Sequence, residues 1–182
     1  MINIKELCEE FKNEFGEYIT QTRIGIKKVG KNEHKLKRLW IHISNKKIKN
    51  AINFLLKFQE NLHISTISGR DVGNEIEIIY FITIQYGLVK KDIVIALVTR
   101  VSKDNPKIQT ITDIIPGAIL YEKEVREMLG VTIENLNDDA KFVLPDDFPE
   151  NLYPLRLDES GISDTHPLVN NAPFIKKGEG KK

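Results

Sequence analysis

Chemically reactive and metal-binding residues are scarce in this sequence. Cys8 is its only cysteine, so the chain can form no disulfide with itself and cannot hold an iron–sulfur cluster, which needs about four ligands, on its own thiolates. Cysteine this sparse is typical of proteins from a reducing compartment. No two histidines stand at the spacing of metal ligands; they are His34, His42, His63 and His166. The sequence therefore predicts no cofactor and no metal held by this chain alone.

Motifs of the common enzyme and membrane classes are also missing. No stretch approaches the ~20 apolar residues of a membrane-spanning helix, and the N-terminus does not resemble a signal peptide. The phosphate-binding glycine loops and the GxSxG nucleophile turn do not occur. His63 and Ser65 would share one face of a strand, as any strand allows, and no base with an orienting group accompanies them. We therefore expect a chain that is not an enzyme by itself and has no direct membrane span.

A surplus of charge of one sign is absent as well. Lys and Arg number 27 against 26 Asp and Glu, whereas a general nucleic-acid binder needs a basic excess, so no nucleic-acid partner is predicted. The charge is unevenly spread, because residues 1–60 hold 13 basic and 7 acidic residues and the remainder holds 14 and 19. The first part is thus +6 and the rest −5. This asymmetry indicates either two faces that meet different neighbours or chance clustering on a solvated surface.

What the sequence does contain is clear helical and strand periodicity. Apolar residues at helical spacing predict amphipathic helices over residues 4–15, 48–59 and 118–129, and Gly16 and Gly130 end the first and the third. Cys8 lies on the apolar side of the first helix, where we expect it to be a buried small hydrophobe.

Alternation of apolar and polar residues predicts five strands. They cover residues 18–28, 39–43, 63–70, 75–86 and 91–101. Short turns join the last three, which predicts an antiparallel meander. The predicted fold class is α+β in two layers: a mostly antiparallel sheet of about five strands with helices on one face, plus an extended C-terminal tail.

Regular periodicity stops after Asn135. The stretch that follows is too long for an ordinary loop, so it is either disordered or lies across a neighbouring subunit. Its apolar content favours the second possibility, because solvated linkers usually contain few apolar residues. They are Phe142, Val143, Leu144, Phe148, Leu152, Tyr153, Leu155 and Leu157.

The region from the third helix onward is acidic. Residues 121–159 contain 11 Asp or Glu and 4 Lys or Arg. The spacing of Glu122 with Arg126, and of Lys123 with Glu127, predicts ion pairs along the helix worth about 0.2–0.5 kcal/mol each. Composition favours a solvated helix face, and a partner contact is the alternative. No calcium-loop spacing is present, so a cation site is not predicted.

Four spaced motifs in this half of the chain resemble those of a known family. They are TDIIPGA at 112–118, EKEVREMLGV at 122–131, LPDDF at 144–148 and YPLRLD at 153–158. In this order they are similar to the signature of the respiratory-chain NADH dehydrogenase 30-kDa subunit family. That family includes the C subunit of complex I and its equivalent in membrane-bound, energy-converting nickel–iron hydrogenases. The resemblance covers roughly residues 3–158.

Several residues depart from the family pattern. Lys123 stands where the family usually has Arg, and Arg126 and Glu127 stand where it favours an aromatic residue and Asp. Residues 133–140 replace a loop that in the family contains Gly-His-Pro-Asp-Leu. These departures favour a hydrogenase-type relative over a standard NADH–quinone enzyme.

The resemblance implies a cofactor-free structural subunit. Residues 1–135 would form the family's α+β domain, and residues 136–182 an extended segment lying on partner subunits. The implied partners are the large catalytic subunit and the iron–sulfur small subunit, which would hold the iron–sulfur clusters and possible nickel–iron centre. The implied location is the cytoplasmic face of the cell membrane, as a peripheral part of a membrane complex.

The residues expected at the partner interface lie on the third helix and in the tail. They are Glu122, Glu124, Arg126, Pro145, Asp146, Phe148, Pro154, Leu155 and Arg156. One alternative is a stand-alone α+β module for protein interaction or assembly. An autonomous hydrolase is a third and weaker hypothesis, because no catalytic motif supports it.

Overall fold

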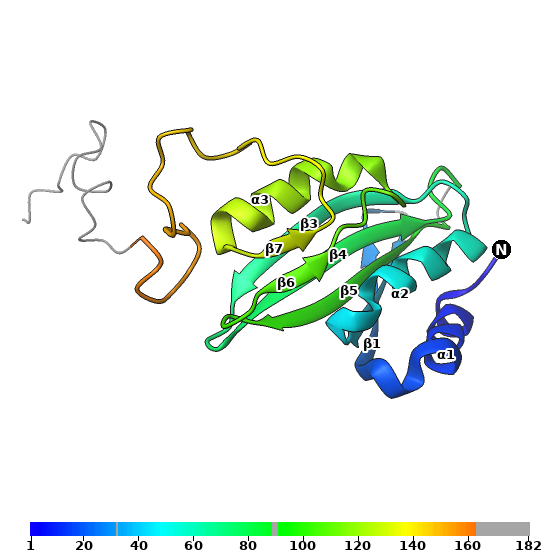
Figure 1. The fold of residues 1–182 in the computed structure, drawn as a ribbon. Helices are drawn as coiled ribbons and strands as arrows, with labels where there is room; N and C mark the ends of the chain where they lie inside the picture. Colours follow the sequence, from blue (N-terminus) through cyan, green and yellow to red (C-terminus); the bar gives the residue numbers. More distant parts are fainter. Residues whose placement is uncertain (32, 89–90, 163–182) are drawn as a thin grey trace, which may run out of the picture.

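Alternating apolar residues form five strands that lie in one sheet, with three helices on one of its faces (Figure 1). The computed structural model describes residues 1–31, 33–88 and 91–162. The strands run in the spatial order β1-β2-β5-β4-β3, and all neighbours are antiparallel except β2 and β5. The predicted α+β class and mostly antiparallel sheet are thus confirmed. The strands are β1 (Ile19–Val29), β2 (His34–Ile43), β3 (His63–Asp71), β4 (Glu75–Ile84) and β5 (Ile93–Ser102).

The three helices are α1 (Ile4–Phe15), α2 (Ile48–Phe54) and α3 (Ile119–Leu129). Asn3 and Glu6 form a reciprocal cap at the start of α1, which satisfies backbone N–H groups that the helix leaves free. Helix α2 is shorter than predicted, because the chain tightens into a 3-10 turn at Leu55–Lys57. Cys8 is buried on α1, as predicted.

Two strand boundaries differ from the prediction. β2 begins at His34 rather than at residue 39, and pairs with β1 along its whole length. Its first residues are largely charged, so apolar alternation could not reveal them. β4 ends at Ile84 rather than at residue 86, because Gln85 has a φ of +58° and leaves the extended conformation.

The strands β3, β4 and β5 form the predicted meander, but β5 also pairs with β2 in parallel. Leu39 stands beside Ile95, and Ile41 beside Leu97, so both pairs place apolar side chains under the helices. The parallel pairing was not predicted. It joins residues more than fifty positions apart, and local periodicity says nothing of such pairs.

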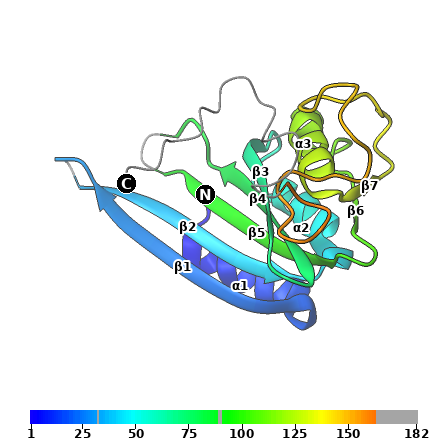
Figure 2. The same ribbon diagram turned by 90° about the vertical axis from the view of Figure 1, so that its left-hand side faces the viewer.

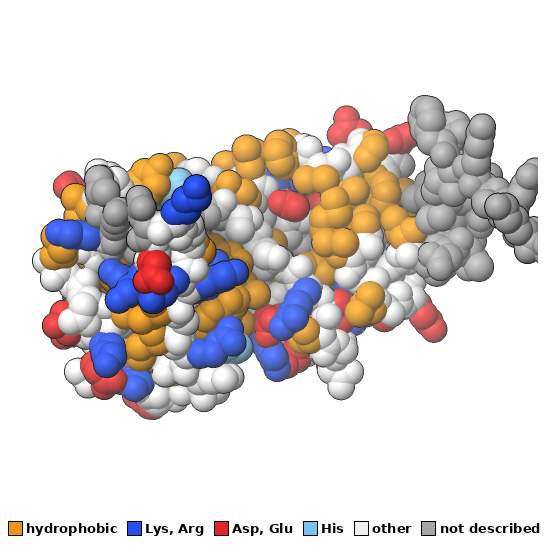
Figure 3. All heavy atoms as spheres, turned by 180° about the vertical axis from the view of Figure 1, so that it is seen from behind, with side chains coloured by type: hydrophobic (Ala, Val, Ile, Leu, Met, Phe, Trp, Pro, Cys, Tyr) orange, Lys and Arg blue, Asp and Glu red, His pale blue; other side chains and the backbone are white. Residues whose placement is uncertain are grey.

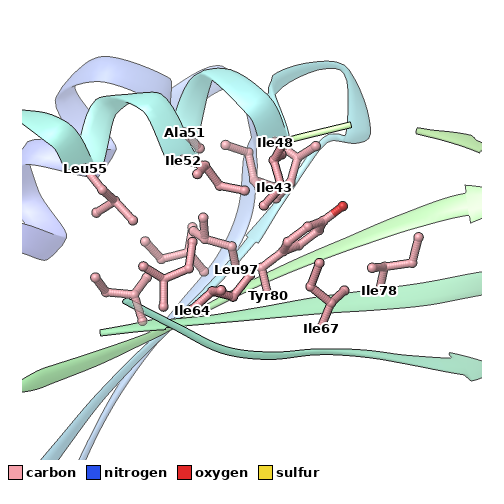
Figure 4. Close-up of a cluster of buried hydrophobic side chains, with 14 of the residues drawn as sticks. Ile43, Ile48, Ala51, Ile52, Leu55, Ile64, Ile67, Ile78, Tyr80 and Leu97 are labelled. Atoms are coloured by element: carbon pink, nitrogen blue, oxygen red, sulfur yellow. The ribbon is translucent and has the colours of Figure 1, made fainter. Parts of the chain in front are cut away.

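The core lies between this face of the sheet and the helices. Figure 4 shows Ala51 and Ile52 of α2, and Leu55 of the 3-10 turn that follows it, pointing toward Tyr80 and Leu97 on the central strands. Phe11 and Phe15 of α1 and Phe54 of α2 meet with ring centroids 5.2–6.0 Å apart. This packing fixes α1 and α2 on the sheet.

Helix α3 packs on the same face at the β3 edge. Gly69 of β3 makes the close approach possible, because a Cβ there would collide with the side chain of Leu129. The short strands β6 (Lys107–Gln109) and β7 (Thr132–Glu134), which flank α3 in sequence, pair in parallel. Gly130 ends α3 with a φ of +67°. The predicted end of the third helix is therefore confirmed.

Candidate partner-binding surface

Residues 135–162, which follow β7 and are called the segment from here on, loop around α3 (Figure 2). Its first anchor is Glu127 on α3, whose carboxylate accepts hydrogen bonds from the backbone N–H groups of Phe142, Val143 and Leu144 at 2.7, 2.8 and 2.8 Å. Burial opposes ionisation of Glu127, but the three donors outweigh burial and hold the pKa of its carboxyl below the usual value.

Two basic residues of α3 add to this anchor. Arg126 donates to the carbonyl oxygens of Asp138 and Ala140 at 2.9 and 3.0 Å. Lys123 is buried and forms an ion pair with the Asp138 carboxylate at 2.5 Å. The predicted ion pairs of Glu122 with Arg126 and of Lys123 with Glu127 are not found among the described residues, so that prediction was wrong. The returning segment offers Lys123 and Arg126 closer acceptors than their own helix does.

A lysine closes the next turn of the segment. The Lys141 Nζ donates to the carbonyl oxygens of Pro145, Asp146 and Phe148 at 3.1, 2.9 and 3.2 Å. One ammonium group can serve three acceptors in this way. The LPDDF motif at 144–148 is therefore held as a turn that returns toward Lys141.

The end of α3 supplies the second anchor. Arg156 is buried and donates from Nε to the Leu129 carbonyl at 2.6 Å, and the Leu155 N–H donates to the Met128 carbonyl at 3.0 Å. The last carbonyl groups of a helix lack donor partners within the helix. The YPLRLD motif at 153–158 therefore acts as a cap for α3.

Gly130 lets the same motif approach closely. The ring of Tyr153 lies so near that a Cβ on residue 130 would stand 2.6 Å from its atoms. The guanidinium of Arg156 lies 5.4 Å from the centre of that ring. A side chain at residue 130 is therefore disfavoured both by the backbone conformation and by Tyr153.

We expect Gly130→Ala to destabilise the protein by about 1–2 kcal/mol, because alanine is strained at this φ. The added methyl group would also displace Tyr153. Urea unfolding measures the first effect, and hydrogen exchange of residues 153–157 measures the second. Gly117→Ala is the control, because its Cβ would meet nothing within 4 Å. Equal stability of the two variants would contradict the prediction.

Asp71 at the end of β3 provides the third anchor. It accepts the Leu157 N–H at 2.8 Å, and its partner Lys103, at 2.5 Å, also reaches Asp158 at 2.6 Å. Burial disfavours the charged form of Asp71, but the hydrogen bonds from Leu157 and Lys103 outweigh it and lower the pKa of its carboxyl.

These anchors hold the backbone while leaving apolar side chains outside. Five large hydrophobic residues of α3 and the segment are 41–82% exposed, and they define what we call the apolar strip: Leu120, Phe142, Val143, Leu155 and Leu157. A hollow of about 140 Å³ adjoins it between β3 and α3, with Glu124 and Leu155 on its rim. Large apolar side chains exposed on a fixed backbone are typical of a protein interface.

Seven of the nine predicted interface residues are at least partly exposed, but two are buried. Glu124, Pro145, Asp146 and Leu155 are exposed, and Arg126, Phe148 and Pro154 are half-buried. Glu122 and Arg156 are only 2% and 9% exposed. Contact of the nine residues with a partner stays a prediction, as does the division at residue 135. Residues 163–182 of the predicted segment lie outside the described residues.

Glu122 is bound inside its own domain. Its carboxylate accepts the Thr110 hydroxyl at 2.6 Å and the Ile111 N–H at 2.7 Å. Burial raises the pKa of Glu122, against the effect of these hydrogen bonds. The sequence held a signal for this burial, because Glu122 follows Ala118 by four residues and precedes Val125 by three, on the apolar stripe.

We expect Glu122→Gln to gain stability relative to the wild type as pH rises. The folded pKa of Glu122 is raised, so its contribution is fully present below about pH 4.5 and is lost as pH rises through the folded value. Glutamine does not titrate. Its amide oxygen can accept the Ile111 N–H, and its amide N–H can donate to the Thr110 hydroxyl oxygen, which reverses that hydrogen bond. Urea unfolding from pH 5 to 8 measures the difference, with the exposed Glu124→Gln as control. A difference that does not change with pH would refute the assignment.

Within the described residues, no helix has the length and apolarity needed to cross a membrane. The same part of the chain contains no group of three or more potential metal ligands from His, Cys, Asp and Glu.

Comparison with known proteins places the chain in a family. Residues 41–164 match the model of the respiratory-chain NADH dehydrogenase 30-kDa subunit family, and the chain belongs to that family. The matched range contains the last three residues of β2, together with α2, β3 to β5, α3 and the anchored segment. The resemblance drawn from the four motifs is thereby confirmed.

The chain is similar in sequence to two relatives and in fold to one solved structure. The chain is 32% identical to the membrane-bound hydrogenase subunit beta of Pyrococcus furiosus, over 79% of this chain and 83% of that protein. It is 28% identical to the C subunit of the F(420)H(2) dehydrogenase of Methanosarcina mazei, over 69% and 77%. A chain in the structure of the membrane-bound sulfane sulfur reductase, an archaeal respiratory membrane complex, has the same fold, with a TM-score of 0.61, 22% identity and coverage of 82% and 81%.

Proposed function

We propose that this chain is a non-catalytic structural subunit in the peripheral, cytoplasmic arm of a membrane-bound hydrogenase or a complex-I-like oxidoreductase. The observation that carries the proposal is the apolar strip, which is exposed although its backbone is anchored at three places. Family membership and relatives named as subunits of a membrane-bound hydrogenase and of a dehydrogenase support it.

The strip would pack on the large catalytic subunit and on the iron–sulfur small subunit. The iron–sulfur clusters, and nickel–iron where the complex is a hydrogenase, would reside in those partners. A backbone already fixed by Glu127, Arg156 and Asp71 loses little conformational freedom on binding, which favours a stable interface. The subunit would bury the flanks of its partners and fix their relative positions.

The hydrogenase type is favoured over an NADH–quinone enzyme. The chain matches the hydrogenase subunit of P. furiosus over most of both lengths. Its departures from the family pattern at Arg126 and Glu127 have structural partners here, because both side chains bind the returning segment. The electron acceptor of the complex would be set by the partner subunits.

Native purification tests the proposal. The tagged full-length chain, expressed in its own host, is solubilised in mild detergent and passed over a sizing column. We expect it to elute with a large complex that contains iron–sulfur proteins, and the chain purified alone to contain neither iron nor nickel and to show no hydrogenase turnover. Elution of the whole pool as a free monomer would instead support the stand-alone interaction module.

A further inference from the structure

The face of the sheet turned away from the helices combines apolar and aromatic side chains with arginines. Figure 3 shows this face from behind, with hydrophobic side chains surrounded by Lys and Arg. We call it the open sheet face and define it by Arg23, Arg38, Trp40, Phe81, Val98 and Arg100. The strand register places these side chains opposite the core, because their neighbours in sequence point into it.

The central strand indicates that this face is covered in the assembled protein. β5 contains the uninterrupted apolar run from Ile93 to Val98, although helices cover only one of its faces. A strand with one wet face alternates apolar and polar residues, whereas a continuous apolar run is typical of a strand covered on both sides. The sequence of β5 therefore fits a second layer that this chain does not supply from its described residues.

Two aromatic side chains form the middle of the open sheet face. Trp40 of β2 and Phe81 of β4 both pair with Ala96, which lies between them on β5. The small side chain of Ala96 leaves room for the rings to meet edge to face, with centroids 5.8 Å apart. Both rings are half-buried, so part of each is available for contact.

Arginines frame this aromatic centre, and two of them form no ion pair with an acidic residue in the part of the chain that the structure describes. Arg23 and Arg38 lie 5.2 and 5.9 Å from the centre of the Trp40 ring. Within residues 1–31, 33–88 and 91–162, neither arginine forms an ion pair. By contrast, Arg70 and Arg100 share the buried carboxylate of Glu77 at 2.5 and 2.9 Å.

The geometry points to an acidic protein surface as the occupant of the open sheet face. Trp and Arg are among the residues most enriched at the energetic centres of interfaces. Uncompensated arginines attract carboxylates and disfavour other cations, so charge complementarity selects the partner. Trp40 and Phe81 would pack on apolar side chains of that partner, and Arg23 and Arg38 would bind its Asp or Glu residues. The inference rests on the proposed function, and it adds a second contact on the side of the sheet opposite the apolar strip.

Charge reversal in the intact complex tests the inference. We expect Arg23→Glu combined with Arg38→Glu to lower the amount of this chain recovered in the complex by about tenfold at moderate salt. Lys5→Glu combined with Lys46→Glu is the matched control, because both lysines lie outside this face and the change in charge is the same. Recovery within about twofold of the wild type is expected for the control. Equal recovery of both variants would overturn the inference.

A second measurement does not depend on disrupting the protein. Arg38→Lys keeps the positive charge and places an amine on the open sheet face, and a carbodiimide then couples it to carboxylates in direct contact. We expect mass spectrometry to identify a cross-linked peptide from another subunit, joined through Asp or Glu. A cross-link only to a second copy of this chain, or no cross-link at residue 38 in an intact complex, would overturn the inference.

The outcomes separate this inference from the proposed function. If the wild-type chain elutes with the large complex but the open sheet face gives no cross-link, the proposed function stands and this inference fails. If the chain never elutes with a complex, the proposed function fails, and the inference that rests on it fails with it. A fluorescein-labelled 20-nucleotide RNA serves as a further probe. Tight binding by the wild type that the double Arg variant abolishes would overturn the inference in favour of a nucleic-acid platform.

Discussion

Replacing Leu155 and Leu157 together by glutamine is expected to remove this chain from its complex without unfolding it. The two side chains are 51% and 82% exposed, and their backbone N–H groups keep their acceptors in the variant. Each amide buried without a partner at the interface costs about 1–3 kcal/mol, so the pair weakens association by at least about tenfold. Co-purification with the tagged large subunit measures the effect.

The control for this prediction is the double variant Leu56→Gln and Leu88→Gln. These leucines are 37% and 47% exposed and lie outside the apolar strip, so the chemistry is matched and the location differs. Thermal unfolding of both variants checks that the fold is kept. If the two double variants remain in the complex to the same extent, the apolar strip is not the interface.

Replacing Glu127 by alanine should release the segment from α3. Three backbone N–H groups lose a charged acceptor, and hydrogen bonds to charged groups contribute about 1.5–3 kcal/mol each where they are buried. Water can solvate part of the freed backbone, so we expect a total loss of about 2–4 kcal/mol. Hydrogen exchange at residues 142–144 and urea unfolding measure the local and the global effect.

Glu124→Ala is the matched control, since Glu124 is exposed and stands one turn earlier on the same helix. Acidification gives a second check. The folded pKa of Glu127 is lowered, so its contribution is present above about pH 4.5 and is lost as pH falls through the folded value. Protection of residues 142–144 should follow that loss in the wild type and should be low at every pH in Glu127→Ala. Protection retained by the alanine variant would mean that other contacts hold the segment.

Helical and strand periodicity was enough to predict most of the fold. The apolar stripe and Gly130 located α3, and alternation located the meander, because one buried face imposes a regular spacing on each element. The parallel pairing of β2 with β5 escaped prediction, since a single sequence does not reveal which distant strands pair. The first residues of β2 were not predicted as strand for a different reason. They are largely charged and bury too few apolar side chains to produce an alternating pattern.

The candidate surface was predictable in part. The apolar residues of the segment were recognised from composition, and Leu155 is exposed as a contact residue must be. The anchors were not predicted, because Glu127 and Asp71 accept hydrogen bonds from backbone N–H groups. Almost every residue has such a group, so the residue types in the sequence do not reveal the partner. Glu122 was expected at the interface although its place on the apolar stripe indicated burial.

The position of β5 has a consequence for the order in which the sheet can form. β5 is the last of the five strands along the chain, yet it lies at the centre between β2 and β4. Until residues 93–102 leave the ribosome, the β1–β2 hairpin and the β3–β4 hairpin have no strand to join them, and each exposes an unpaired inner edge. Synthesis that stalls before this strand would therefore leave two aggregation-prone halves, and a chaperone that shields them would act during this interval.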